Sequence, residues 1–242
     1  MSASPPVALV TGSSSGIGAA IARRFAQEGY CVVVNSARSA EAGQALAAEL
    51  DGIYVQADLS DAGQVVALVD KAVTARSRLD VLINCAGTTE VIDHADLDSA
   101  DLDVWHRILD VNLLGAWAAI VAAVPHLRKS GAGQVINVTS TSGTRPMGSS
   151  IPYAVSKAAM NHMTLLLAKA LGPEIRVNAV APGMVDTPWT ADWDAAREHV
   201  SRTVALRRPG RPEDIADACW GVATSAYMTG AVVPVDGGLS LQ

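Results

Sequence analysis

Aromatic residues, charges and cysteines are all scarce in this sequence. Only 4% of the 242 residues are aromatic and 17% are charged, and the three cysteines (Cys31, Cys85 and Cys219) lie far apart. Three such cysteines suit neither a disulfide framework nor a cysteine-rich zinc site, so we expect no metal centre. The formal net charge of −6 argues against a nucleic acid or an anionic membrane as the main partner.

Long hydrophobic runs are also missing. No stretch of about 18 uncharged apolar residues occurs, which predicts no membrane-spanning segment, and the first residues lack the basic region and apolar core of a signal peptide. Half of the residues are nevertheless apolar, which is enough for a large core. We therefore expect a cytoplasmic globular protein whose single domain spans residues 1–242.

Short β-branched segments alternate with longer segments of helical periodicity along the chain. We expect strands at Val7–Thr11, Cys31–Asn35, Ile53–Gln56, Val81–Asn84, Val135–Thr139, Val177–Val180 and Ala231–Val235, and helices near 17–28, 40–50, 62–75, 102–129, 152–171 and 212–225. Almost wholly apolar strands suit a sheet covered on both faces, and the alternation favours parallel βαβ units. The expected fold is therefore α/β with a seven-stranded parallel sheet, and two irregular stretches, 141–150 and 183–211, are expected to shape a pocket.

A glycine-rich turn follows the first expected strand. It reads Gly12-Ser13-Ser14-Ser15-Gly16-Ile17-Gly18 and leads into a helix. Gly12 permits a tight turn, Gly16 lets the backbone approach a diphosphate, and Gly18 lets the helix pack closely on the strand. The free N–H groups at the helix start would then face the anion. This arrangement predicts a dinucleotide-binding turn, and an ordinary glycine-rich connection is the alternative.

The residues after the second strand indicate which dinucleotide binds. An acidic side chain there would bind the adenosine ribose hydroxyls of NAD(H) and repel a 2′-phosphate. This chain has Ser36 and Arg38 at that point and no acid before Glu41. Because Ser36 can donate a hydrogen bond and Arg38 can pair with a phosphate, NADP(H) is favoured over NAD(H). Arg38 could instead be a solvated residue at a helix start.

Tyr153 and Lys157 are four residues apart, which places both side chains on one face of an expected helix. A free tyrosine has a pKa of about 10, and a nearby ammonium would lower it toward the range useful for acid–base work. Ser140, at the end of the fifth strand, could bind the oxygen of a carbonyl substrate. Together these residues predict proton transfer to a carbonyl oxygen during hydride transfer. A surface pair of Tyr153 and Lys157 is the structural alternative.

Other segments could also contact a nucleotide. Asn84-Cys85-Ala86-Gly87 is a small-residue turn after the fourth strand, and Asp58 could accept a hydrogen bond from the adenine amino group. The turn from Pro182 to Thr187 offers backbone groups to a carboxamide. Asn112 is a poor helix former inside the expected helix 102–129, which indicates a hydrogen-bonding role.

Joined together, these motifs resemble the classical short-chain dehydrogenase/reductase family over essentially the whole chain, with members like 3-oxoacyl-(acyl-carrier-protein) reductase and glucose dehydrogenase. The resemblance implies a Rossmann-type doubly wound fold with a cofactor half at about 1–140 and a catalytic and substrate half at about 141–242. It implies that Tyr153 is the acid/base and that Ser140 orients the substrate oxygen. Lys157 would lower the tyrosine pKa and bind the nicotinamide ribose, and Asn112 would hold a water molecule in a proton relay.

The same resemblance assigns further residues to the cofactor. They are Gly12, Ser14, Ser15, Gly16, Ile17, Gly18, Ser36, Arg38, Asp58, Leu59, Asn84, Ala86, Gly87, Tyr153, Lys157, Pro182, Gly183, Val185 and Thr187. One position departs from the family, because NADP-preferring members often carry a basic residue where this chain has Ser15. The resemblance also implies a homotetramer, or a homodimer, formed through the helices at 102–129 and 152–171.

The function expected from these observations is a NADP(H)-dependent oxidoreductase that interconverts a ketone and a secondary alcohol, with a small 3-oxoacyl-type carbonyl compound as substrate. An NAD-dependent alcohol dehydrogenase is one alternative, and a dinucleotide-sensing protein without chemistry is another. Trp189 and Trp193 lie in the irregular stretch after Thr187. They could close as a lid over an apolar substrate or simply pack that segment down.

Overall fold

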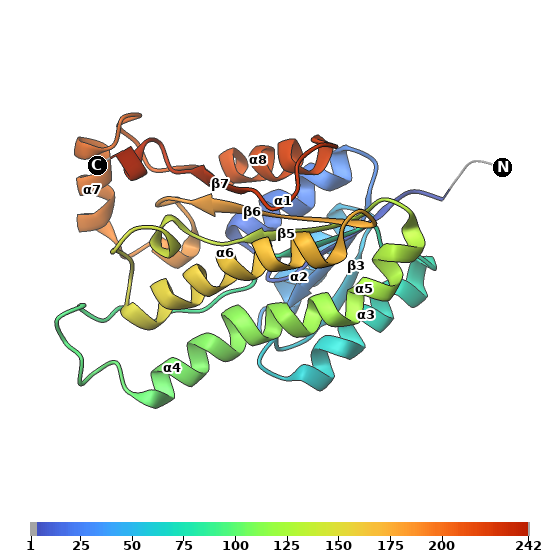
Figure 1. The fold of residues 1–242 in the computed structure, drawn as a ribbon, viewed down its shortest axis with the longest axis horizontal. Coiled ribbons are helices and arrows are strands. Elements are labelled where there is room, and N and C mark those ends of the chain that lie inside the picture. Colours follow the sequence, from blue (N-terminus) through green and yellow to red (C-terminus); the bar gives the residue numbers. More distant parts are fainter. Residues whose placement is uncertain (1–3, 242) are drawn as a thin grey trace.

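Seven parallel strands form the centre of the molecule, and helices cover both faces of their sheet (Figure 1). The computed structural model describes residues 4–241. The strand order is β3-β2-β1-β4-β5-β6-β7, so the winding reverses between β1 and β4. The strands are β1 (Val7–Val10), β2 (Cys31–Ser36), β3 (Ile53–Gln56), β4 (Val81–Asn84), β5 (Gly133–Val138), β6 (Ile175–Pro182) and β7 (Val232–Val235). The predicted seven-stranded parallel sheet is confirmed.

Two hydrophobic cores lie on opposite faces of the sheet, which explains why the inner strands are apolar throughout. Every residue of β1 and of β4 is buried. One core joins the sheet to α1 (Gly16–Gln27), α2 (Ala40–Glu49) and α8 (Pro212–Thr224). The other joins it to α3 (Ala62–Arg76), α5 (Ala116–Ser130) and α6 (Ile151–Leu171). The parallel register brings the carboxyl ends of the strands to one edge of the sheet, at the left of Figure 1.

The helix expected at 102–129 is interrupted. It consists of α4 (Leu102–Leu109), a π-helical segment at Asp110–Gly115, and α5. The three parts follow one another as a single green rod in Figure 1. A π-helical segment inserts an extra residue into the turn and is frequent at functional sites. Asn112 lies within this segment, and it is buried.

The stretch 183–211 was expected to be irregular, and this expectation is wrong for part of it. It contains a 3-10 turn at Pro188–Thr190 and α7 (Asp194–Thr203). Val200 is the buried residue of α7, so the helix lacks the repeated apolar positions that mark a helix in a sequence.

The helical run Leu102–Ser130 is long and apolar enough to cross a membrane, judged by its length and composition alone. Its inner side belongs to the protein core, where Ala119, Ile120 and Leu127 are buried. Its outer side exposes Trp117 and Val121. A core helix with an apolar outer side meets the same criteria, so this run is only weak evidence for a membrane.

Candidate active site

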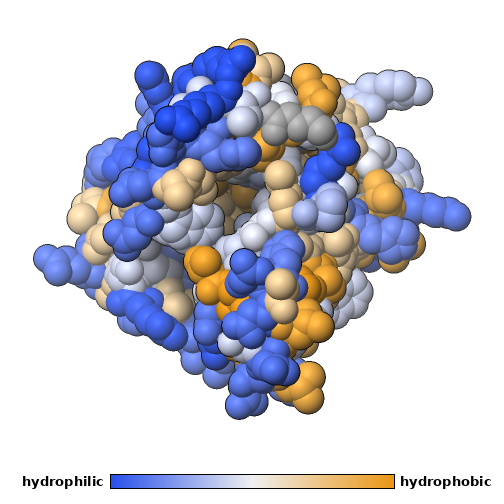
Figure 2. Space-filling model, turned by 90° about the vertical axis from the view of Figure 1, so that its left-hand side faces the viewer, coloured by the Kyte–Doolittle hydropathy of each residue, from blue (hydrophilic) through white to orange (hydrophobic). Residues whose placement is uncertain are grey.

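A cavity of about 1260 Å³ opens where the carboxyl ends of the strands meet. Figure 2 looks onto this end of the molecule and shows a hollow near its centre, with hydrophilic and hydrophobic residues around it. The expected site residues that line the cavity are Gly12, Ser14, Ser15, Gly16, Ile17, Gly18, Ser36, Arg38, Asp58, Leu59, Ala86, Gly87, Ser140, Tyr153, Lys157, Pro182, Gly183, Val185 and Thr187. Asn84 and Asn112 do not line it, and they lie behind its walls.

The glycine turn has the shape that an anion cradle needs. Gly12 and Gly16 have positive φ angles of 63° and 53°. A Cβ atom on Gly12 would lie 2.6 Å from the Ala86 Cα atom, and one on Gly18 would lie 2.4 Å from the Gly12 carbonyl oxygen. Ser15, the N-cap residue of α1, makes no side-chain capping hydrogen bond, and the first turn holds no acidic residue. The turn and helix start therefore fit a diphosphate group.

Asn35 holds this turn in place, a role that the sequence reading missed. Its Oδ1 atom accepts a hydrogen bond from the Gly12 N–H at 3.2 Å, and its Nδ2 group donates to the Val55 and Ala57 carbonyls. The Ser13 N–H donates to the Asn35 carbonyl oxygen at 2.8 Å. A fully buried asparagine inside an apolar strand was the signal that could have revealed this role.

Ser36 and Arg38 lie at the end of the cavity beside β2. The Ser36 hydroxyl is paired with the Tyr54 hydroxyl at 2.9 Å, so it is fixed in orientation. Arg38 is exposed, lines the cavity, and forms no salt bridge with any residue of the part that the structure describes. The guanidinium is therefore available to a phosphate at this end.

Asp58 and Asn84 have partners of their own. Asp58 Oδ1 accepts hydrogen bonds from the Ser60 N–H and hydroxyl at 2.9 and 2.8 Å, while the side chain still borders the cavity. Asn84 donates to Asn137 Oδ1, and Asn137 donates to the Thr164 hydroxyl, each at 2.9 Å. This buried chain ties β4 to β5 and α6, so Asn84 supports the sheet behind the cavity.

Ser140, Tyr153 and Lys157 meet at one side of the cavity. Ser140 follows β5, and its hydroxyl oxygen accepts a hydrogen bond from the Ser142 N–H at 3.1 Å, which leaves the hydroxyl proton to donate. The Ser140 side chain also lies near enough to Tyr153 to act on its pKa. Lys157 is buried; its ammonium donates to the Val138 carbonyl at 3.1 Å and lies 5.7 Å from the centre of the Tyr153 ring.

Burial has the largest effect on the pKa values of Tyr153 and Lys157. Burial raises the pKa of Tyr153 to about 12, although the nearby Ser140 side chain acts in the opposite direction. Burial lowers the pKa of Lys157 to about 8. Removal from water disfavours the phenolate more than Ser140 stabilises it, so the Tyr153 pKa moves upward rather than downward. Tyr153 therefore carries its proton at neutral pH.

Asn112 acts on the site through its neighbours. Its Oδ1 atom accepts from the Thr88 N–H at 2.7 Å, and its Nδ2 group donates to the Thr88 carbonyl and to the Ser156 hydroxyl, both at 3.0 Å. Both Nδ2 donors and one lone pair of Oδ1 are thus engaged with protein groups. Through Ser156 the amide joins the loop after β4 to α6, three residues after Tyr153.

The segment after β6 crosses the cavity. Thr187 lies against the glycine turn, since a Cβ atom on Gly16 would come within 3.3 Å of the Thr187 side chain. Trp189 lies edge-on to Tyr153, with ring centres 6.3 Å apart and planes at 75°. The sequence indicated Trp189 as a possible lid or packing residue, but it did not indicate this contact with Tyr153. Only the tertiary fold brings the two residues together.

Within residues 4–241, no group of three or more His, Cys, Asp or Glu side chains is placed to hold a metal ion.

Comparison with known proteins gives consistent relatives. The family model described as Enoyl-(Acyl carrier protein) reductase matches residues 12–240. The chain is 55% identical over 240 residues to ketoacyl reductase 2 of the granaticin polyketide synthase of Streptomyces violaceoruber, covering 98% of this chain and 96% of that protein. It is 37% identical to the 3-oxoacyl-(acyl-carrier-protein) reductase FabG of Thermotoga maritima, covering 96% and 97%. A solved short-chain dehydrogenase/reductase structure from Burkholderia xenovorans is 39% identical with a TM-score of 0.92, covering 99% and 100%.

Proposed function

The chain belongs to the short-chain dehydrogenase/reductase family, and on that premise we propose that it is a NADPH-dependent reductase of ketones, acting on 3-oxoacyl-type substrates. The observation that carries the proposal is that Ser140, Tyr153 and Lys157 face the same cavity as the glycine turn of α1. Ketoacyl reductase relatives support the same reaction. A bound nicotinamide would supply the hydride.

The proposed roles of the side chains follow from their contacts. The Ser140 hydroxyl, fixed by Ser142, donates a hydrogen bond to the carbonyl oxygen of the substrate. Tyr153, which carries its proton at neutral pH, transfers that proton to the same oxygen. A protonated tyrosine suits reduction, because the carbonyl oxygen gains a proton in that direction. Lys157 faces the Tyr153 ring and stabilises the phenolate that the transfer leaves.

NADPH is favoured over NADH in this proposal by the chemistry at the end of β2. Arg38 lines the cavity without a salt-bridge partner among the described residues, and no acid follows before Glu41. The 2′-phosphate of NADPH would pair with the guanidinium fork, whereas an acidic side chain, as in NAD(H)-binding turns, would repel that phosphate.

We also propose that copies of the chain associate as a homotetramer or a homodimer through α5 and α6, whose outer sides expose Trp117, Val121 and Leu166.

A cytoplasmic location is part of the proposal. The three cysteines, Cys31, Cys85 and Cys219, are all free. Free thiols are usual in a compartment that keeps cysteines reduced.

The test is the oxidation of NADPH in the presence of a short 3-oxoacyl thioester, followed by the loss of nicotinamide absorbance. We expect turnover by the unaltered enzyme and a loss of at least 1000-fold in Tyr153→Phe, which lacks the transferable proton. The dissociation constant for NADPH should stay within about threefold in this variant. Retained turnover in Tyr153→Phe would remove Tyr153 from the role of acid. Faster turnover with NADH and an alcohol would instead favour an NAD-dependent dehydrogenase.

A further inference from the structure

Trp189 lines the cavity beside Tyr153. Its side chain is 45% exposed, and its six-membered ring reaches toward the loop after β4, where a Cβ atom on Gly87 would lie 3.4 Å from Trp189 Cη2. The same indole is edge-on to the Tyr153 ring. Trp189, which follows β6, therefore lies close both to Gly87 in the loop after β4 and to Tyr153 in α6. It is one of few aromatic residues in the chain.

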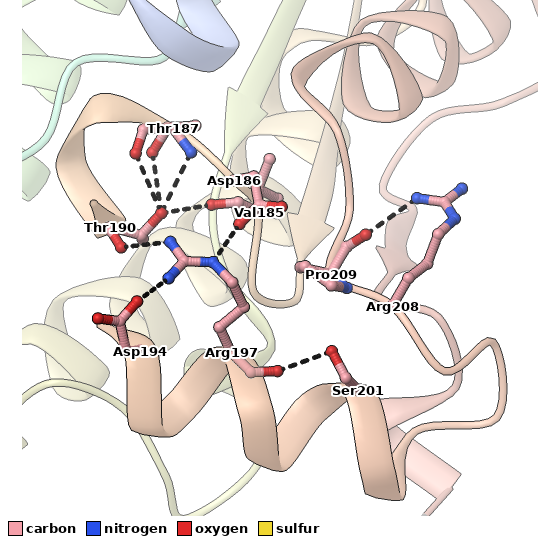
Figure 3. A network of polar contacts seen from close by, with 9 residues as sticks. All are labelled: Val185, Asp186, Thr187, Thr190, Asp194, Arg197, Ser201, Arg208 and Pro209. Carbon is pink, nitrogen blue, oxygen red and sulfur yellow. Dashed lines mark hydrogen bonds and ion pairs between the residues drawn. The ribbon is translucent and has the colours of Figure 1, made fainter. Parts of the chain in front are cut away.

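A polar network holds the turn that carries Trp189. Figure 3 shows Arg197 of α7 at the centre of this network. Its guanidinium donates to Asp186 Oδ1 at 2.9 Å, to Asp194 Oδ1 at 2.6 Å and to the Thr190 carbonyl at 3.0 Å. The residues on both sides of Trp189 are thus pinned to one side chain.

The turn is also closed on itself. The Thr190 hydroxyl donates to the Val185 carbonyl at 2.8 Å, and the Thr187 N–H donates to the Thr190 hydroxyl at 3.1 Å (Figure 3). Val185 is paired with Gly210 in an isolated parallel bridge. An indole on a backbone fixed in this way loses little freedom when a ligand packs on it, which increases what such a contact contributes to binding.

Part of the cavity lining is apolar and contains two methionines. Met147 and Met184 line the cavity and pack with Val200, Val204 and Leu239. Methionine side chains adapt to irregular shapes and make favourable contacts with aromatic rings. A flat group beside Trp189 would therefore meet an indole, in a cavity whose lining also contains adaptable methionine side chains.

The cationic side chains that line the cavity give no reason to expect an anionic group next to the reacting carbonyl of the substrate. Among the described lining residues, Arg107 is paired with Glu90 and Arg38 lies beside β2. Lys157 is directed to the Val138 carbonyl and the Tyr153 ring. The part of the substrate beside Trp189 is therefore expected to be uncharged.

From this geometry we propose that Trp189 selects ketones whose carbonyl is attached to a flat aromatic ring, by packing its indole on that ring while Ser140 and Tyr153 hold the carbonyl oxygen. The inference rests on the proposed function and narrows its substrate class. Aromatic pairs in offset or edge-to-face arrangement are favoured beyond their buried area, by up to about tenfold in binding.

Three ketones with eight carbons separate ring, flatness and bulk: acetophenone, cyclohexyl methyl ketone and 2-octanone. Conjugation makes acetophenone intrinsically the least reactive toward hydride, so a cavity without an aromatic selector would reduce it most slowly. We expect the enzyme with NADPH to show a higher kcat/KM for acetophenone than for either other ketone, by up to about tenfold. Equal values, or a preference for 2-octanone, would overturn the inference.

Substitutions then assign the preference to Trp189. Trp189→Leu keeps apolar bulk without a ring, and we expect the acetophenone to 2-octanone ratio to fall by up to about tenfold, while Trp189→Phe retains most of it. Arg197→Lys loses the guanidinium fork and should lower the ratio through the turn, whereas Arg202→Lys, on the same helix and paired with Glu198, should leave it unchanged. An unchanged ratio in Trp189→Leu would overturn the inference.

The two levels of the proposal fail differently. Oxidation of NADPH with a 3-oxoacyl thioester, but with none of the three ketones, would overturn the inference and leave the proposed reduction standing. No oxidation of NADPH or NADH with any of these carbonyl compounds would overturn both.

Discussion

The side-chain amide of Asn112 donates to the Ser156 hydroxyl at 3.0 Å, and that hydroxyl donates in turn to the main-chain carbonyl of Tyr153 at 2.7 Å. The π-helical segment after α4 is therefore connected to the residue proposed as the acid by two hydrogen bonds. Because Asn112 also closes a pair of hydrogen bonds with Thr88, it sets the distance between the loop after β4 and α6. Its amide is a positioning group.

Replacing Asn112 tests this positioning role. Asn112→Ala leaves the Thr88 N–H and carbonyl without partners in a partly buried setting, and we expect a loss of about 1–3 kcal/mol in the free energy of unfolding. We also expect kcat to fall at least tenfold with a smaller change in KM, because Tyr153 is displaced. Urea unfolding and steady-state kinetics measure the two effects.

Ser156→Ala is the matched control, because it removes only the link to Tyr153. It should cost about 1 kcal/mol of stability and lower kcat by less than Asn112→Ala. A larger loss of kcat in Ser156→Ala than in Asn112→Ala would show that the contacts with Thr88 are unimportant.

Two glycines in helices should respond in opposite ways to alanine. A Cβ atom on Gly18 would lie 2.4 Å from the Gly12 carbonyl oxygen and 2.8 Å from Ser13 Cα, both in the backbone of the cofactor turn. We expect Gly18→Ala to lower the free energy of unfolding and to weaken NADPH binding at least tenfold, since the turn must shift. Gly221 in α8 has no heavy atom within 4 Å of its Cβ position, so Gly221→Ala should stabilise the protein by about 0.5–1 kcal/mol. Calorimetric melting and cofactor titration of both variants check the contrast, and equal effects would contradict it.

The sheet, the glycine turn and the grouping of Ser140, Tyr153 and Lys157 could be predicted from the sequence. Each depends on local signals: apolar strand segments, glycines at fixed spacing, and a four-residue helical interval. Parallel strands then bring their ends together at one edge, so residues that follow β1, β2, β4, β5 and β6 share one cavity. The parallel topology of the sheet thus places motifs that are far apart in the sequence around one cavity.

Other features depend on contacts between distant segments and left no local signal. The π-helical segment at Asp110–Gly115 interrupts a run that the sequence predicts as one helix, and the poor helix former Asn112 did not indicate the change of helix type. Helix α7 shows no apolar periodicity because Val200 is its buried residue. The pKa of Tyr153 depends on how much water the folded cavity removes, which residue types alone do not give.

Stability should depend on pH through Lys157. Burial lowers the pKa of Lys157 from 10.5 to about 8, so between these values the unfolded chain binds more protons than the folded protein. The contribution of Lys157 to stability therefore rises as pH rises from about 8 toward 10.5, and it is least favourable below pH 8, by about 3 kcal/mol.

The experiment compares the enzyme with Lys157→Met by urea unfolding at pH 7, 8 and 9. We expect Lys157→Met to have its greatest relative stability at pH 7 and to lose this advantage as pH rises. Tyr153 and Cys85, whose pKa values burial raises to about 12, titrate in both proteins and largely cancel from the difference. Lys169→Met, at an exposed position of the same helix, should differ from the enzyme by a constant amount. A constant difference for Lys157→Met as well would contradict the lowered pKa.

Arg38 should determine the choice between the two dinucleotides. It lines the cavity beside β2 and forms no salt bridge within residues 4–241, so its guanidinium is free to pair with a 2′-phosphate. A hydrogen bond to a charged group contributes about 1.5–3 kcal/mol. Arg38→Ala should therefore weaken NADPH binding by at least tenfold and leave NADH binding within about twofold. Arg38→Asp should reverse the preference, because a carboxylate repels the phosphate and accepts hydrogen bonds from the ribose hydroxyls. Dissociation constants from fluorescence titration at one salt concentration measure both effects.

Arg128→Ala is the control for the change in net charge. It removes an exposed arginine of α5 that is paired with Glu174, and it should alter neither dissociation constant. If Arg38→Ala weakens both dinucleotides equally, Arg38 contacts a part that they share, and the preference for NADPH must come from Ser36 or be absent.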